Sequence, residues 1–288
     1  MIGVSGATRL LALATFCIAL STSPVRAAGE PGTASGTYQH SFFEGQNATF
    51  RHAVAIRTTM VEDGETAPVV RVLLSDAPVS VDELKGAPRF PRFIDAVRKG
   101  SLEGAIIDYV PGKADGTRIA TLTTDPDGVS SGYETHAQTK DGPFAWQQIA
   151  IAGDVISGAM KKGEYDFRFA ARIVDDPVTE QLRGAAAAAH PLSGVWSQNV
   201  NAILGGNADL AKTYLSKRAA SDPARQEPGY WPQLIKSYQA NRATMLKAAK
   251  FNLIVVRGAR ATAVSAPAPG VTMMAEFVLE DGAWKLEG

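Results

Sequence analysis

The spacing of the apolar residues changes near residue 190, and this change constrains the fold more than any other feature. Between residues 35 and about 174, short runs of alternating apolar and polar residues are separated by Gly, Pro, Asp and Asn. Such runs predict β-strands, because the side chains of a strand point alternately to its two faces. After Ser193 the apolar residues recur at three- and four-residue intervals, which is typical of helices. We therefore expect a β-rich part followed by a mixed part.

The β-rich part, residues 36–178, is predicted to be a mostly antiparallel sandwich or barrel. In the run 48–58, the side chains of Phe50, Val54 and Ile56 should share one face, whereas Arg57 lies on the other. One short helix is expected at 90–99. The predicted strands are 38–43, 48–58, 69–75, 104–110, 118–123, 133–138, 146–151 and 165–173.

The mixed part is predicted to begin after an alanine-rich helical linker, residues 179–192, which Pro191 ends. A first helix should end at Gly205, and a second should begin after Asn207, a good N-cap residue. A third is expected from near Pro232 to about Ala249. Four strands follow, and Asp281-Gly282 predicts a tight hairpin between the last two. These strands are 251–257, 260–266, 271–280 and 283–286.

Three stretches of the mixed part carry a family resemblance: 201–207 (NAILGGN), 214–216 (YLS) and 277–286 (FVLEDGAWKL). On these stretches, residues 193–288 resemble the NTF2-like family, including its SnoaL-like and small exported members. The resemblance implies an α+β cone in which three helices pack on a curved antiparallel sheet. In that family the cone can enclose a pocket that serves binding and, in a few members, proton transfer.

Four aromatic residues on the predicted helix faces are the candidate ligand-binding residues of this cone. They are Trp196, Tyr214, Trp231 and Tyr238. Aromatic residues at helical spacing more often form a packed core than a ligand pocket, so core packing is the favoured interpretation and a cone lining is the alternative.

Glu276 is the best-placed acidic residue on a strand of the mixed part. Alternation puts its side chain opposite Ala275 and Phe277, which we expect to face the helices. Glu276 should therefore be solvated or lie at an interface. The less polar residues of its face include Met274, so this face is expected to meet either the first part of the chain or a second copy.

No residue set predicts catalysis, metal binding or a cofactor. The G-x-S-x-G match at 128–132 places Ser130 in a hairpin loop rather than in a strand-to-helix turn. His40 and His52 lack the further ligands that zinc needs, and Asp125-Pro126-Asp127-Gly128 is interpreted as a turn rather than a calcium site. We therefore name no catalytic residue, no metal ligand and no cofactor.

Residues 1–27 resemble a cleavable signal peptide of a bacterial exported protein. An apolar run at 10–20 follows Arg9, and small residues surround the expected cut after Ala27. Residues 28–35 should be a flexible N-terminus. Without Arg9 and Arg26 the formal charge is −2, which suggests no nucleic-acid partner. No later apolar run predicts a membrane anchor, and the only cysteine, Cys17, lies in the signal.

The sequence thus predicts a periplasmic or secreted α+β protein that binds rather than catalyses. Its partner would be a small apolar ligand in the C-terminal cone or an envelope protein on the β-rich part. Two alternatives stay open: a hydrolase or isomerase with its site in the cone, and an envelope assembly or interaction protein. A homodimer through the C-terminal sheet is also expected.

Overall fold

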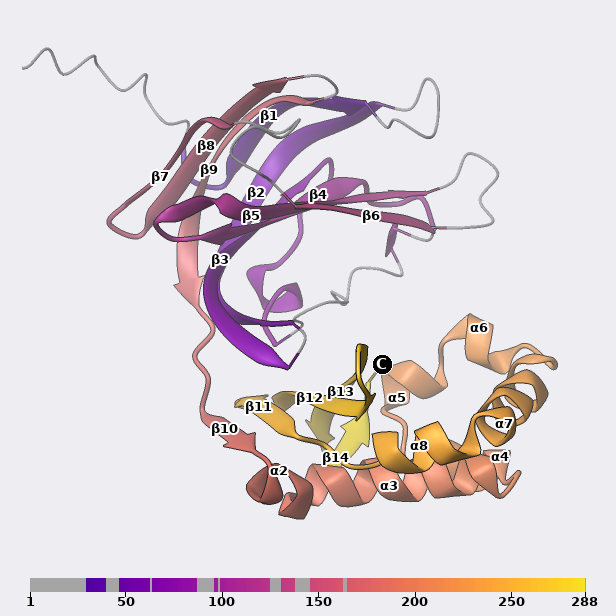
Figure 1. Ribbon diagram of the computed structural model, residues 1–288. Helices are drawn as coiled ribbons and strands as arrows, with labels where there is room; N and C mark the ends of the chain where they lie inside the picture. The colour runs from indigo at the N-terminus through magenta and orange to yellow at the C-terminus, as the bar shows by residue number, and fades with distance from the viewer. Residues whose placement is uncertain are drawn as a thin grey trace, which may run out of the picture.

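Two antiparallel sheets, one large and curled and one small, form the framework of the molecule (Figure 1). The computed structural model describes residues 30–39, 47–62, 64–86, 96–97, 99–124, 131–137, 146–162 and 165–287. The small sheet lies between the large sheet and the main helices. The fold is therefore mixed α+β.

The large sheet has nine strands in the described residues, in the order β6-β5-β4-β3-β2-β1-β9-β8-β7. Most neighbours are consecutive strands joined by hairpins. β9 also pairs with β2 in parallel at residues 55–57, beyond the end of β1. The bounds are β1 Thr33–Gln39, β2 Asn47–Glu62, β3 Glu65–Ser75, β4 Gly104–Val110, β5 Lys113–Thr124, β6 Ser131–Ala137, β7 Trp146–Ala152, β8 Val155–Lys162 and β9 Tyr165–Asp175.

Every strand of this sheet except β8 was predicted from the sequence, but β1 was misplaced. It begins at Thr33, so the expectation of a flexible N-terminus over 28–35 is wrong for residues 33–35, and it shares only residues 38 and 39 with the predicted strand 38–43. Gly158 interrupts the apolar alternation of β8, and strand interiors disfavour glycine. The structure gives the reason for this glycine: a Cβ there would lie 2.6 Å from a ring carbon of Phe169 on β9. Residues 40–43 of the first predicted strand lie outside the described residues. Of the helix predicted at 90–99, Ala96, Val97 and Lys99 are described; the first two are helical and Lys99 lies in a turn.

Two apolar clusters pack on this sheet. An aromatic cluster includes Tyr38, Phe50 and Phe167, and a separate aliphatic cluster includes Ile56 and Leu73. The prediction that Phe50 shares a face with Val54 and Ile56 is wrong, because Val54 and Ile56 belong to the aliphatic cluster. The change of side falls where the β1–β2 register is irregular, between His52 and Phe50, and such irregularities bend a sheet.

The small sheet has the strand order β10-β11-β12-β13-β14. Its strands are β10 Glu180–Arg183, β11 Leu253–Arg257, β12 Arg260–Ala268, β13 Val271–Glu280 and β14 Ala283–Leu286. The hairpin predicted at Asp281-Gly282 is confirmed, since both residues have positive φ, 51° and 78°.

Seven α-helices and one 3-10 helix are described. They are η1 Val81–Glu83, α2 Ala185–Ala189, α3 Pro191–Leu204, α4 Ala208–Lys212, α5 Lys217–Ala220, α6 Pro223–Gln226, α7 Tyr230–Ala240 and α8 Arg242–Ala248.

The helical linker predicted for 179–192 needs correction. Residues 180–183 form β10, because pairing with β11 outweighs local helix propensity. The five alanines do form α2. Pro191 does not end a helix but begins α3, with His190 as its N-cap. The third predicted helix is interrupted at Asn241, which separates α7 from α8.

The two faces of the small sheet have different neighbours. Ile254, Ala263 and Phe277 face the helices and form one core with Trp196. On the other face, Met274 packs with Val61 of β2. The expectation that the Met274 face meets the first part of the chain is therefore confirmed. Glu276 shares this face and is only 6% exposed, so it lies at the interface and is not solvated.

A buried arginine joins the two sheets. Arg257 on β11 donates from Nη2 to the carbonyl oxygen of Thr59 on β2 at 2.6 Å, and its Nε lies 3.6 Å from Asp176. Asp176 follows β9 and also accepts hydrogen bonds from the Thr58 hydroxyl at 2.9 Å and the Gly86 N–H at 3.1 Å. Burial lowers the pKa of Arg257, and the charge of Asp176 opposes this shift. We call these contacts the Arg257–Asp176 clamp.

Removing the charge of Asp176 should destabilise the fold. Breaking one partner of a buried ion pair leaves an uncompensated charge, so we expect Asp176→Asn to lower the free energy of unfolding by about 3 kcal/mol. The neighbouring Asp175 pairs with Arg57 in solvent, at 2.8 Å. Asp175→Asn should therefore change stability by less than about 1 kcal/mol. Urea unfolding measures the free energy of unfolding of both variants. Equal losses in the two variants would contradict the stabilising role of the clamp.

Candidate functional site

The interior of the predicted cone is packed with side chains. Trp196 on α3 stacks on Phe251 with ring centroids 5.9 Å apart and an interplanar angle of 22°. Its Nε1 donates to the carbonyl oxygen of Ala248 at 2.8 Å, and Phe251 meets Phe277 edge-to-face at 5.8 Å. Trp196 is therefore a core residue with its polar atom satisfied.

The other three candidate aromatic residues lie together, among the outer helices. Tyr214, Trp231 and Tyr238 are partly buried and pack against a cluster formed by α3 and α4, together with Leu234 and Ile235 of α7. Burial raises the pKa of Tyr238 above its ordinary value of 10.0, and Tyr230 adds to the shift. The structure thus brings Tyr214, Trp231 and Tyr238 together, and Tyr214 and Tyr238 also pack against the core that contains Trp196.

Trp231 opens onto a hollow of about 540 Å³, which we call the helical hollow. Lys212 Nζ lies over the indole, 5.6 Å from the ring centroid, and Arg225 lines the same space. The full lining is Lys212, Leu215, Ala220, Arg225, Gln226, Glu227, Pro228 and Trp231. Tyr214 instead lines a smaller hollow of about 370 Å³ between α3 and α4.

Side-chain caps produce the short helices that surround the helical hollow. Asn207 accepts a hydrogen bond from the Leu210 N–H at 2.9 Å, as the sequence analysis predicted from its N-cap position. Ser216 and Asp222 cap α5 and α6 in the same way, at 2.9 and 3.0 Å. The sequence analysis missed these two caps, although Ser216 and Asp222 are residue types that begin helices and Pro223 follows directly.

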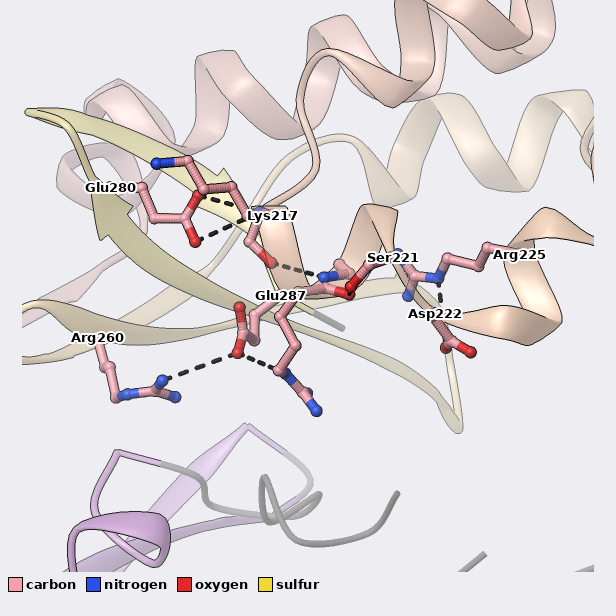
Figure 2. Close-up of polar contacts among 10 residues, drawn as sticks. Lys217, Ser221, Asp222, Arg225, Arg260, Glu280 and Glu287 are labelled. Carbon is pink, nitrogen blue, oxygen red and sulfur yellow. Dashed lines mark hydrogen bonds and ion pairs between the residues drawn. The ribbon is translucent and has the colours of Figure 1, made fainter. Parts of the chain in front are cut away.

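A network of polar contacts holds α5 against the last two strands (Figure 2). The Lys217 N–H donates to both carboxylate oxygens of Glu280, at 3.0 and 3.3 Å. Arg218 Nε donates to Glu287 at 2.8 Å, and Arg260 Nη2 lies 3.7 Å from the same carboxylate. Figure 2 shows Glu287 between the two guanidinium groups. The next helix along the chain after α5 is α6, which contains Arg225 of the Asp222–Arg225 pair.

Glu287 is charged despite its burial. Burial by itself would raise its pKa, but hydrogen bonds from Ser216 and Arg218 and the charges of Arg218 and Arg260 outweigh it and lower the pKa below 4.5. Arg260 in turn packs on Gly86 of the first part, where a Cβ would overlap the Arg260 side chain. Helix α5 is therefore connected, through Glu287 and Arg260, to the segment that follows η1 in the first part of the chain.

The remaining candidate residues form no second site. His52 is half-buried, and in the parts of the chain that the structure describes no group of three His, Cys, Asp or Glu side chains could hold a metal ion. His190 serves as the N-cap of α3, accepting from the Leu192 N–H at 3.3 Å. His40, Ser130 and the turn at 125–128 lie outside the described residues.

Comparisons with known proteins identify no relative. No family model, curated protein or solved structure matches the chain. Among the described residues, none of the helices has both the length and the apolar character needed to span a membrane. The function must therefore be argued from the site itself.

The charge of Glu287 should make stability depend on pH. A carboxylate whose pKa is lower in the folded state contributes stability above its unfolded pKa and loses it as the pH falls through the folded value. We expect Glu287→Gln to destabilise the protein at neutral pH, and the difference from wild type to shrink below pH 4.5. Urea unfolding across this range measures the difference.

Asp281→Asn is the matched control, since the Lys217–Asp281 pair is exposed on both sides and solvent screens it. This variant should have the same free energy of unfolding as wild type at neutral pH and below pH 4.5. A Glu287→Gln difference that grows in acid would contradict the proposed electrostatics.

Proposed function

We propose that this protein is an exported binding protein that holds an anionic, partly apolar ligand in the helical hollow. One observation carries the proposal: the indole of Trp231, the ammonium of Lys212 and the guanidinium of Arg225 line a single space with apolar residues. The volume, about 540 Å³, lies in the range typical of small-molecule sites. Glu227 also lines the hollow, so its cations outnumber its acidic groups by two to one, and an aromatic face with this excess of positive charge suits a ligand that has one apolar portion and one acidic group.

The cations of the hollow are available to a ligand. Lys212 is paired with Asp209 at 3.0 Å, but the Asp209 side chain is 93% exposed, so the pair contributes little and exchanges readily with solvent. Arg225 Nε lies 4.0 Å from Asp222, which exceeds hydrogen-bond distance. A ligand carboxylate in the hollow would therefore gain charge-assisted hydrogen bonds and displace only weak contacts.

The interior of the cone is packed with side chains, and this packing favours binding over catalysis as the function of the protein. The helix-facing residues of the small sheet in its core are apolar, among them Ile254, Ala261, Ala275 and Leu286. Acid–base catalysis requires a titratable group beside a space that the substrate can enter, and this core is filled by side chains, with Tyr214 and Tyr238 packed against it. The alternative of a hydrolase or isomerase with its site in the cone therefore has less support.

The family and the location are parts of the same proposal. Residues 193–288 contain α3 and α8 packed on an antiparallel sheet of the kind that the NTF2-like resemblance implies, and we infer membership of that fold family. The apolar run at 10–20 and the small residues around Ala27 support export to the periplasm or beyond.

Titration with dodecanoate, which has one carboxylate and an apolar chain, tests the ligand class. We expect measurable binding by isothermal titration calorimetry, weakened about tenfold by Lys212→Ala or Arg225→Ala, because each removes one charge-assisted hydrogen bond. Lys236→Ala is the matched control, since Lys236 is an exposed α7 residue outside the hollow.

Dodecanol provides the matched neutral ligand. It should bind more weakly than dodecanoate to wild type and equally well to wild type and Lys212→Ala. Equal affinities of the two ligands for wild type, or a loss in Lys236→Ala as large as in Lys212→Ala, would contradict the proposal.

A further inference from the structure

β7 is an edge strand of the large sheet that carries no charge. Its sequence is Trp-Gln-Gln-Ile-Ala-Ile-Ala, and among the described residues it pairs only with β8. The other sheet edges are charged: β6 contains Glu134, β10 contains Glu180 and Arg183, and β14 contains Lys285. Charges on edge strands prevent pairing with other chains, so β7 lacks the protection that the other edges have.

The apolar face of the large sheet that carries the aromatic cluster continues onto β7, the last strand of the sheet. Trp146 and Ile149 are half-buried against the aromatic cluster, and the register with β8 puts Ile151 opposite the buried Ile156 of that cluster. Ile151 nevertheless remains 36% exposed, the one large apolar side chain with this much exposure in the described part of the large sheet. A strand added beside β7 would cover it.

We propose that β7 pairs antiparallel with β7 of a second copy of this chain, so that the two large sheets join into one. A two-fold axis at Ile149 would place Ile149 opposite its copy, Gln148 opposite Ala150, and Gln147 opposite Ile151. Antiparallel pairing of identical strands closes with two-fold symmetry and gives a dimer rather than an open chain.

The charges around β7 favour its own copy as the occupant. No like charges face one another in this register, because the strand has none. Near its two ends, charged groups that the structure describes are already paired within one chain, Arg172 with Asp154 at 3.6 Å and Lys161 with Asp166 at 3.0 Å. The small sheet is a poorer dimer surface than the sequence suggested, since its Met274 face already packs on Val61.

Sedimentation equilibrium of the whole chain tests the dimer. We expect a mass twice the 30.4 kDa of one chain for wild type, and the mass of one chain for Ile151→Lys, which puts two charges into the contact. Leu279→Lys is the matched control, since Leu279 is 41% exposed and lies on β13 of the other sheet. It should remain dimeric.

A cysteine cross-link tests the register in a Cys17→Ser background. Paired residues of an antiparallel sheet have Cα atoms about 5 Å apart, within disulfide reach. Ile149→Cys should therefore form an intermolecular disulfide on oxidation, whereas Ala152→Cys, opposite Trp146, should not. A monomeric wild type overturns the proposal and leaves the edge to a strand from another protein. A dimer that survives Ile151→Lys overturns this surface, and a cross-link through residue 152 instead of 149 overturns the register.

Discussion

Burial of the Arg257 guanidinium between two sheets is the constraint on which the rest of the molecule depends. A buried cation is costly unless charged and hydrogen-bonding partners surround it, and here these partners come from distant parts of the chain. Thr59 belongs to β2, and Asp176 lies where the chain leaves the large sheet. Arg257 reaches these partners because β11 lies beside the ends of β2 and β9, so the clamp ties the small sheet to this place on the large sheet.

This placement determines where a ligand can bind. One face of the small sheet is covered by β2, and the other is filled by the stack of Trp196 and Phe251. The hollow that Trp231 lines lies instead among the short helices. Glu287 connects the two regions, because it contacts Arg218 on α5 and Arg260 on the sheet face that meets Gly86. The helical hollow is thus built on the same framework that the clamp holds together.

Residues whose role is set by local geometry could be predicted from the sequence. Strand alternation was enough to place Glu276 and Met274 on the face that meets the large sheet, and Asp281-Gly282 was enough for the last hairpin. Gly158 and residues 180–183 were misjudged, because a contact with Phe169 and pairing with β11 decide their structure. Of the helical hollow, Trp231 was a candidate, but Lys212 and Arg225 were not. They come from separate short helices, α4 capped by Asn207 and α6 capped by Asp222, which lie side by side only after folding.

The central claim is that ligand binds in the helical hollow and not inside the cone, and the four tryptophans allow a direct measurement. Each indole N–H gives its own NMR signal, and Trp196 and Trp231 mark the two alternatives. With dodecanoate as the ligand, the account predicts that the Trp231 signal shifts in proportion to occupancy while the Trp196 signal stays in place. A shift of Trp196 with Trp231 unchanged would place the ligand in the cone and contradict the account.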